Sequence, residues 1–566
     1  MANITKITNI TELKTRKGRS GAQVELQGYY TLQDSGGGRF YWDNTSILPD
    51  NKGTIIQVVG VTIGRWIREY SGYGNVKFFG TIEDGITDDS IRIQLALDNM
   101  ESIEFNEKSY LTTTTINIPT SKNIRFNNSI IINNSFTDVN TATSLNNYLL
   151  EINNSNDINF SGNLYLKSNN GGLNCVTNGL KINNSENIYL NGTINLINLN
   201  FGLGLLNVNN SFINIINGKN INGYQLSLGL GGDLMFFVNC NNIKINTVKG
   251  IDIQKAGVYF SLDANLGYNK NISIVTVDMI LNLSTVSSAV ALRNIDGLYI
   301  NSINSINGVS GLYCSYDSVS GYINNININS ITVIDNTSVT DNSYAVYLTS
   351  ITSINGNNKA KNFYIGNIFN DNSNKGSLII DKCENVNINQ LISLNSSQSS
   401  IRIIGSNNIN ITETIVDSLS NNGILMDSEL SNNIDFINIK LNNVLTPYYG
   451  VRIDNNMLKN GSFNNIYLSN CTTDYAIYYA TMSSVSNSLS NISINNVDYL
   501  CFINVYICSF VKNGEMFLSS ILSHLLTVGF NGDIVKNSNL TLGNNIGWIC
   551  TSTGNLGTWN QFGVIV

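Results

Sequence analysis

Two aspartates in the middle of the chain have the residue type and spacing of a paired carboxylate site. Asp233 lies 20 residues after Ile213, and Asp263 lies 20 residues after Ile243; these isoleucines mark two successive copies of a short repeated phrase. If the copies form stacked coils, the two carboxylates occupy the same outward turn, ~5 Å apart. Carboxylates about 5–5.5 Å apart cleave glycosidic bonds with retention of configuration, whereas a wider pair does so with inversion.

The same sector of the neighbouring copies adds further groups for such a site. Asp317 is a third candidate catalytic carboxylate, and the glycine-rich run 228–232 predicts a long loop that forms a groove wall. The alternative is structural, because aspartates in glycine-rich or asparagine-rich turns often bond the local backbone. The candidate substrate-binding residues are Tyr268, Lys270, Arg293, Tyr313 and Tyr316. For Lys270 and Arg293 the alternative is a solvated surface charge.

Other residue types narrow the chemistry. Asp381, Asp427 and Asp454 each follow a Gly-apolar-x-apolar phrase, where Asn183 also falls, and they are interpreted as structural. The chain has one histidine, His524, which argues against a His-centred triad or a His-rich metal site. We therefore expect no metal and no other cofactor.

The elements that position these residues are predicted by the repeated phrase, which reads Asn, apolar, any residue, apolar. It occurs, for example, as Asn123-Ile124-Arg125-Phe126 and Asn408-Ile409-Asn410-Ile411, at spacings of 23 to 34 residues along most of the repeat. Its alternation indicates a strand with one buried face. The Gly-apolar-x-apolar phrase, as in residues 257–260, supplies a second short strand in each period.

This period predicts an all-β fold: a right-handed single-stranded parallel β-helix of about fourteen turns over residues 116–502. Leucine-rich and helical repeats fit poorly, because helix-length segments with a 3.6-residue period are missing. Asparagine concentrates at the expected turns, where it tolerates the left-handed backbone region. Asparagine side chains stacked from turn to turn can also bond one another along the axis.

Composition excludes several classes of protein. The net charge is −7 and no Lys/Arg cluster occurs, so nucleic acid is not an expected partner. No signal-peptide pattern and no ~20-residue apolar run is present, so we expect folding in a cytoplasm and no membrane insertion. The eight cysteines are scattered without a CxxC pair, which is typical of small core residues rather than disulfides or metal ligands.

Both ends of the chain lack the repeat. Residues 1–74 predict a small β module with glycine turns, and residues 75–115 predict the start of the β-helix with a capping helix. In that helix Thr87 to Ser90 offer N-cap chemistry, and Ile91, Leu95 and Leu97 form the apolar face. Residues 503–566 predict a small C-terminal β module, whose apolar run 503–526 suits a closing cap or a contact between subunits.

The two ends carry a resemblance to a known family. The block Gly28-Tyr29-Tyr30, Gly36-Gly37-Gly38-Arg39-Phe40-Tyr41-Trp42-Asp43 and Gly64-Arg65-Trp66 resembles the head of bacteriophage tailspikes. The block Val76-Lys77-Phe78-Phe79-Gly80 with Asp84-Gly85-Ile86-Thr87-Asp88-Asp89 is similar to the start of pectate-lyase-like β-helices, where it marks the fold and not an active site. The tail from Gly532 to Gly563 is similar to a module that ends many phage spike proteins.

The resemblance implies a homotrimeric spike in a phage or prophage tail, made in the bacterial host cytoplasm. Such a spike binds, and usually degrades, a bacterial surface polysaccharide (capsule or O-antigen), and it contacts other tail proteins through its N-terminus. Three functions stay open: an endo-acting glycoside hydrolase or, less readily, a polysaccharide lyase; a spike that binds without cleaving; and a secreted lyase. The phage-type ends argue against the third.

Overall fold

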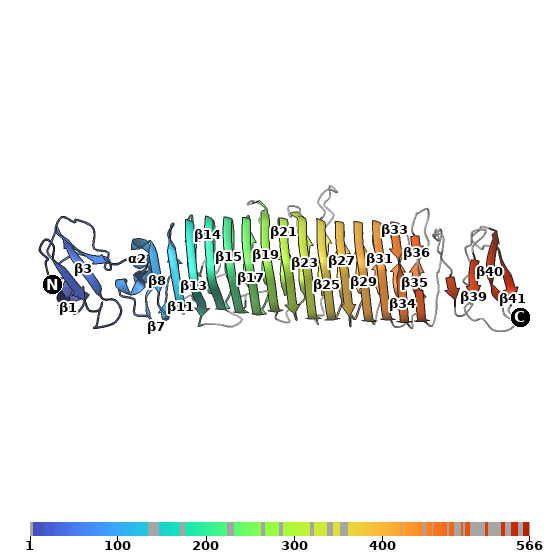
Figure 1. Cartoon of the computed structure of the whole chain (residues 1–566), viewed down its shortest axis with the longest axis horizontal. Coiled ribbons are helices and arrows are strands. Elements are labelled where there is room, and N and C mark those ends of the chain that lie inside the picture. The colour runs from blue at the N-terminus through green and yellow to red at the C-terminus, as the bar shows by residue number, and fades with distance from the viewer. Residues whose placement is uncertain are drawn as a thin grey trace. The chain divides into compact units, whose positions relative to one another are not determined.

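The computed structural model is all-β except for short helices, and Figure 1 shows the parallel strands stacked side by side. The chain divides into a first unit, residues 1–282, and a second unit, residues 283–566, and each is described by itself. The structure describes residues 4–133, 147–169, 176–222, 231–261, 267–281, 287–316, 322–336, 343–350, 360–419, 422–444, 449–454, 457–471, 475–479, 488–490, 493–497, 516–518, 534–537, 545–552 and 558–564.

The first unit begins with a small β-sheet domain. Its sheet has the strand order β1-β2-β3-β5-β4 and packs around Trp42 and Trp66, whose rings meet edge-to-face at 5.2 Å. The elements are β1 (Thr5–Ile7), α1 (Ile10–Leu13), β2 (Gln23–Leu26), β3 (Gly38–Asp43), β4 (Ile55–Ile56) and β5 (Arg65–Glu69). The predicted N-terminal β module is thus present.

A buried arginine ties this domain to the start of the β-helix. The Arg68 guanidinium donates hydrogen bonds to the carbonyl oxygens of Gly36, Gly37 and Gly53. It also lies over the rings of Phe40 and Phe78, at 4.5 and 4.1 Å from their centroids. Because Phe78 belongs to the segment that follows the domain, one side chain holds both parts together.

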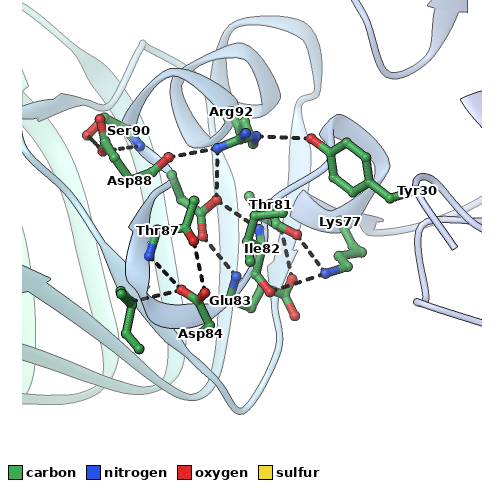
Figure 2. Close-up of polar contacts among 12 residues, drawn as sticks. Tyr30, Lys77, Thr81, Ile82, Glu83, Asp84, Thr87, Asp88, Ser90 and Arg92 are labelled. Carbon is green, nitrogen blue, oxygen red and sulfur yellow. Dashed lines mark hydrogen bonds and ion pairs between the residues drawn. The ribbon is translucent and has the colours of Figure 1, made fainter. Parts of the chain in front are cut away.

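The Asp-Gly-Ile-Thr-Asp-Asp block forms a closed set of local hydrogen bonds (Figure 2). Asp84 accepts from the backbone N–H groups of Ile86 and Thr87, and the fully buried Asp89 accepts from those of Ile82 and Glu83. Figure 2 also shows Arg92 reaching from α2 to the Tyr30 hydroxyl, 3.2 Å away. These contacts order the turn, as expected for a fold marker. The elements here are β6 (Gly74–Asn75), η1 (Val76–Phe79), β7 (Asp84–Asp88) and α2 (Ser90–Asn99).

Helix α2 lies at the open end of the β-helix, as predicted, but with a different buried face. The Gln94 side-chain amide both donates to and accepts from the Asn117 backbone, at 2.9 Å each way, as a neighbouring strand would. The buried apolar residues are Ile93, Ala96 and Leu97, whereas Ile91 is 72% exposed. The expected face was therefore wrong at Ile91, because the helix begins only at Ser90 and turns that residue toward solvent.

The remaining strands of the first unit pair in parallel from coil to coil. They are β8 (Ser102–Phe105), β9 (Ser109–Leu111), β10 (Ile116–Asn117), β11 (Asn123–Asn133), β12 (Tyr148–Asn153), β13 (Asn156–Ser168), β14 (Asn178–Leu199), β15 (Leu203–Ile221), β16 (Met235–Val238), β17 (Asn241–Ile253), β18 (Ala256–Phe260) and β19 (Asn269–Leu281).

The second unit repeats the same parallel pairing and ends in a separate sheet, β38-β39-β40-β41. Its strands are β20 (Ser288–Leu292), β21 (Asn294–Ile306), β22 (Ser310–Tyr316), β23 (Tyr322–Asn336), β24 (Tyr344–Ser350), β25 (Lys361–Ser373), β26 (Gly376–Asp381), β27 (Glu384–Leu394), β28 (Ile401–Ile404), β29 (Asn407–Leu419), β30 (Ile424–Met426), β31 (Ser431–Val444), β32 (Tyr449–Ile453), β33 (Leu458–Asn464), β34 (Ile466–Cys471), β35 (Tyr475–Tyr479), β36 (Ser488–Ser490), β37 (Ser493–Val497), β38 (Met516–Leu518), β39 (Ile534–Asn537), β40 (Asn545–Ser552) and β41 (Thr558–Val564).

The parallel β-helix predicted from the repeat is confirmed. Strands carrying the Asn-apolar phrase or its equivalent begin six coils from β11 to β19 in the first unit and eight from β21 to β36 in the second. This agrees with the predicted number of about fourteen. The C-terminal β module is present as the four-stranded sheet, while most of the apolar run 503–526 lies outside the described residues.

The observed strand register differs from the repeat predicted from the sequence at one coil. Ile213 pairs with Leu190 and Ile245, and Ser211, not Ile213, pairs with Ile243. Ser211 is buried; its hydroxyl donates to the Asn209 carbonyl at 2.8 Å and accepts from the Ile188 N–H at 3.1 Å. A polar residue therefore holds this core position, and the apolar pattern alone shifted the predicted register by two residues.

Asparagine ladders run along the corners of the coils. In the second unit, the side-chain amides of Asn362, Asn385, Asn408, Asn433 and Asn460 each bond the next at 2.8–3.3 Å. All five have φ between 54° and 59°, in the left-handed region. The two predicted roles of asparagine, the left-handed turn and the axial ladder, thus meet in the same residues.

The described cysteine side chains are core residues, as predicted. Cys240, Cys314 and Cys383 are buried free thiols. Burial raises the pKa of Cys240 and Cys314 to about 12, which makes both poor nucleophiles. Of the helices that the structure describes, none has the length and apolar character to cross a membrane.

We predict that Asn408→Ala lowers the free energy of unfolding more than Asn408→Gly. Alanine loses the ladder bonds and strains a left-handed backbone, a total of about 2–3 kcal/mol, whereas glycine loses only the bonds, about 1 kcal/mol. Denaturant unfolding followed by circular dichroism measures both variants. Equal losses would show that backbone conformation is not what asparagine supplies at this corner.

We also predict that Arg68→Met destabilises the N-terminal domain by about 2–4 kcal/mol, because three buried carbonyl groups lose their donor. The matched control is Arg39→Met on the neighbouring strand, where Arg39 is exposed and the change should stay within about 0.5 kcal/mol. Thermal unfolding of residues 1–282 within the full chain, followed by Trp42 and Trp66 fluorescence, reports the loss. Similar behaviour of the two variants would contradict the role of Arg68.

Candidate functional site

In the first unit, Asp233 is a buried member of an ion pair. It is 2% exposed, and its Oδ2 lies 3.3 Å from the Lys255 ammonium. The same ammonium lies 5.0 Å from the centroid of the Tyr259 ring. The contacts of Asp233 therefore hold two neighbouring segments together, and Lys255 links it to the outer face of β18.

The register separates Asp233 from the place expected for Asp263. Asp233 lies two residues before β16, and Met235 pairs with Val258, so Asp233 is level with Ala256 at the start of β18. Asp263 follows the end of β18 and lies outside the described residues. The prediction that both aspartates share one outward turn assumed that Ile213 is equivalent to Ile243. The observed register shows that Ser211 is the residue equivalent to Ile243. The catalytic assignment of this pair stays a prediction.

Two of the predicted substrate-binding residues lie together at the start of β19. Tyr268 is exposed, and the Lys270 ammonium lies 5.8 Å from the centroid of its ring. Both side chains face solvent, which suits either a sugar contact or a solvated surface.

The other predicted residues belong to the second unit. Arg293 is half-buried in the single-residue break between β20 and β21, and Tyr313 faces outward from β22. Tyr316 ends β22, but its side chain lies outside the described part of the chain, as does the whole of Asp317. Of these residues, Tyr313 belongs to a larger set of outward-facing side chains on successive coils.

We call this arrangement the outer strip; it lies on the outward face of strands β22 to β32 in the second unit. The register places Tyr313, Tyr347, Ile379, Arg402, Leu425 and Arg452 in one column across successive coils. A second column lies two residues further along each strand and contains Thr349, Asp381, Ile404, Asp427 and Asp454. Stacked strands lie ~4.8 Å apart, so each coil adds one pair of side chains at a regular spacing.

One end of the outer strip is aromatic. The Tyr313 and Tyr347 rings stack at 5.1 Å between centroids and 17° between planes. Tyr344 lies 6.4 Å from Tyr347 and is buried with Ile379 and Ile404. Burial raises the pKa of Tyr347 to about 12, so its hydroxyl stays protonated at neutral pH.

The other end holds two fixed guanidinium–carboxylate pairs. Arg402 donates to both carboxylate oxygens of Asp427, at 2.9 and 2.8 Å. Arg452 donates to Asp454 at 2.8 Å and lies 5.5 Å from the centroid of the Tyr449 ring. Bidentate pairs of this kind set the orientation of both side chains.

Asp381 lies between the two ends. Its Oδ2 accepts a hydrogen bond from the Thr349 hydroxyl at 3.2 Å. Its Oδ1 is buried and accepts no hydrogen bond from any described group. Burial raises the pKa of this carboxyl, against the opposing effects of the Lys382 charge, the Thr349 hydrogen bond and the Arg402 charge, while the Glu429 charge adds to the rise.

Sequence reasoning reached one residue of the outer strip, Tyr313, and interpreted Asp381, Asp427 and Asp454 as structural. Their observed side-chain partners are threonine and arginine rather than turn backbone. The sequence does contain a signal for the outer strip, namely the third position (x) of the Gly-apolar-x-apolar phrase. That position is Tyr313 in residues 311–314 and Arg452 in residues 450–453, and it always faces outward.

The next question is whether described side chains could bind a metal ion. Across them, no three His, Cys, Asp or Glu side chains gather as the ligands of an ion would. The outer strip instead offers aromatic faces, hydrogen-bonding side chains and one partly buried carboxyl.

Comparison with solved structures finds β-helical phage proteins at low similarity. The tailspike protein gp49 of Acinetobacter baumannii bacteriophage Fri1, a capsular polysaccharide depolymerase, aligns over 98% of this chain and 91% of its own, with 10% identity and a TM-score of 0.33. The gp42 tailspike of Acinetobacter phage vb_AbaP_AS12 aligns over 99% and 94%, with 11% identity and a TM-score of 0.40. The pre-mature gene product 12 of bacteriophage phi29 aligns over 80% and 60%, with 15% identity and a TM-score of 0.48.

The N-terminal domain is the segment with a family assignment. No curated protein matches the chain in sequence. Residues 6–71, which hold the sheet around Trp42 and Trp66, match the family of the phage tail protein small four-stranded β-sheet domain. The phage resemblance predicted from the N-terminal motifs is thus confirmed for this domain, because residues 6–71 are similar to a phage tail protein family.

Proposed function

We propose that the protein is a phage tail spike that attaches to a bacterial surface polysaccharide through the outer strip and cleaves it by hydrolysis within the chain. The observation that carries this proposal is the outer strip itself: stacked tyrosines, two oriented arginine–aspartate pairs and a partly buried carboxyl on successive coils. A ladder of such groups suits a ligand that is itself a repeating chain.

The chemistry of the outer strip matches a sugar polymer. Tyrosine rings offer flat apolar faces for the C–H faces of sugar rings, together with a polar hydroxyl. Arg402 and Asp427 hold each other in place, so they can bond hydroxyl groups without first losing side-chain freedom. The arginines and Lys382 nearly balance the four carboxylates at Asp381, Asp427, Glu429 and Asp454, which favours a substrate of low charge density.

The N-terminal domain supports attachment to the phage tail. Ile47, Leu48, Val59 and Ile63 are exposed by 50–77%. Arg65 joins the two loops that carry them, with bonds to the carbonyl oxygens of Leu48 and Thr62. Exposed apolar side chains on loops that are held in place suit docking to another tail protein, and a location in the virion tail is part of this proposal.

A homotrimer is part of the proposal. In the second unit Phe369, Ile392 and Ile415 pair in register at outward positions of β25, β27 and β29, on a different face from the outer strip. All three are only half-buried in the single chain. A row of outward apolar side chains on three successive coils suits a contact with a second copy of the chain.

We predict that Tyr313→Ala weakens polysaccharide binding about fivefold to tenfold, because one ring of the stacked pair is lost. The probe is an array of purified capsular polysaccharides and O-antigens, followed by calorimetry on the glycan that binds. Tyr364→Ala is the control, since Tyr364 is exposed on the outward face of β25, which lies outside the outer strip, and its loss should leave binding unchanged.

The same assay separates the alternatives. Shorter oligosaccharides identify a hydrolase, while an unsaturated product absorbing near the ultraviolet edge identifies a lyase. Binding without fragments identifies a spike that only attaches. Equal loss of binding in Tyr313→Ala and Tyr364→Ala would rule out the outer strip as the binding surface.

For assembly, we predict that light scattering gives three times the chain mass at micromolar concentration, and that Ile392→Glu shifts the protein toward monomers. A charge at that position must be desolvated in any contact that buries it. A monomeric wild-type protein would contradict the trimer.

A further inference from the structure

The outer strip contains two carboxyl groups in sharply different surroundings. Asp381 ends strand β26, with Oδ1 buried and without a described donor, while the Thr349 hydroxyl bonds Oδ2 at 3.2 Å. Glu429 follows strand β30, two coils further along, and its side chain is 50% exposed. A carboxyl that is buried favours its neutral form, and a carboxyl in water favours its ionised form.

The Glu429 side chain reaches from its own coil to a residue two coils away. Its Oε1 lies 2.8 Å from the ammonium of Lys382, the residue next to Asp381. The intervening coil offers no side chain in the way, because it presents Gly405 there. A Cβ on Gly405 would lie 2.9 Å from Glu429 Oε2, so a side chain at this position would press on the Glu429 carboxylate and shift it. Gly405 also donates its backbone N–H to the Glu429 carbonyl at 3.2 Å.

The result is a carboxyl pair held across the outer strip. Lys382 binds the Glu429 carboxylate beside the segment that carries Asp381. Burial raises the pKa of Asp381; the positive charges of Lys382 and Arg402 and the Thr349 hydrogen bond oppose this rise, and the Glu429 charge adds to it. Directly beside the pair, Arg402 and Asp427 form the bidentate contact described above, and the stacked tyrosines lie on the other side.

Resting on the proposed function, we propose that Asp381 is the proton donor and Glu429 the base of an inverting glycoside hydrolysis. The Asp381 O–H gives its proton to the glycosidic oxygen as the bond from that oxygen to the anomeric carbon breaks. A water molecule attacks the opposite face of the anomeric carbon, and the Glu429 carboxylate takes the proton that this water loses. The leaving sugar gains one hydroxyl, the new reducing end gains the other, and one water is consumed.

The separation of the two residues favours inversion over retention. Their strands lie two coils apart, roughly 10 Å at the backbone. Inverting enzymes hold their carboxyl groups about 6.5–9.5 Å apart to admit water, whereas retaining enzymes hold them at about 5–5.5 Å. A two-coil separation, shortened by the reach of Glu429, suits the wider range.

The test compares Asp381→Asn and Glu429→Gln with the wild-type full chain on the polysaccharide that binds in the array. Each variant should cleave at least 100-fold more slowly than wild type, since general acid and base contributions are typically 10²–10⁴, while calorimetric binding should change less than threefold. Asp435→Asn is the control, because Asp435 is exposed on the outward face of β31, which lies outside the outer strip, and its change should leave the rate unchanged. Proton NMR of the first product should show the inverted anomer.

A folding control is built into Asp381. Its folded pKa lies above its unfolded value, so wild-type stability falls as pH rises through that pKa, and Asp381→Asn removes this loss. The variant should therefore melt no lower than wild type at pH 8, and a slow rate cannot be ascribed to unfolding. The wild-type rate should fall at high pH, as Asp381 ionises.

Two results overturn the inference while the proposed function stands. One is cleavage by both variants at wild-type rates, and the other is a retained anomer in the first product. Wild-type protein that binds without cleaving also overturns it, whereas the binding role of the outer strip survives. Wild-type protein that binds no polysaccharide removes the proposed function itself.

Discussion

The left-handed corner is the constraint on which the rest of this structure depends. A coil closes only where the chain turns without a side-chain clash, and at most corners this requires a positive φ. Asparagine meets the requirement at Asn385, Asn408 and Asn433, and the amides then bond from coil to coil. Because the corners repeat at the same place in each coil, backbone pairing stays in register, and the register decides which side chains stack.

Stacking in register turns outward positions into surfaces. The inward positions of β22 to β32 are committed to the core, as Cys314, Leu348 and Ile380 show. The outward positions carry no such demand, so the chain can place a tyrosine pair and two arginine–aspartate pairs there without affecting the packing inside. The scaffold supplies the spacing and the outer strip supplies the chemistry. At Gly405 the intervening coil has no side chain, and the Glu429 side chain extends past this position to Lys382.

The sequence was sufficient to predict the β-helix, its number of coils and both end modules, because periodicity and asparagine corners are local signals. It was not sufficient at Ser211, where a buried hydroxyl with two backbone partners replaces the expected isoleucine. The loss of an apolar residue moved the apparent repeat by two positions. That shift explains only part of the place of Asp233, which the register sets level with Ala256: the segment from Ile221 to Met235 is nine residues longer than its counterpart from Ile253 to Val258.

The outer strip escaped prediction for a different reason. An aspartate after a strand carries the same local signal whether it bonds turn backbone or an arginine on the next coil. What separates Asp427 from a turn former is Arg402, 25 residues earlier, and that distance has meaning only once the coil length at this place is known. Glu429 depends in the same way on Lys382 and on the empty position at Gly405. In a solenoid, therefore, the residues that form turns can be recognised from the residues next to them in the sequence. The residues of an outward site are recognised only from the side chains beside them on adjacent coils. Sites on such folds will be found by aligning outward positions coil by coil, with the register taken from hydrogen bonds rather than from the apolar phrase.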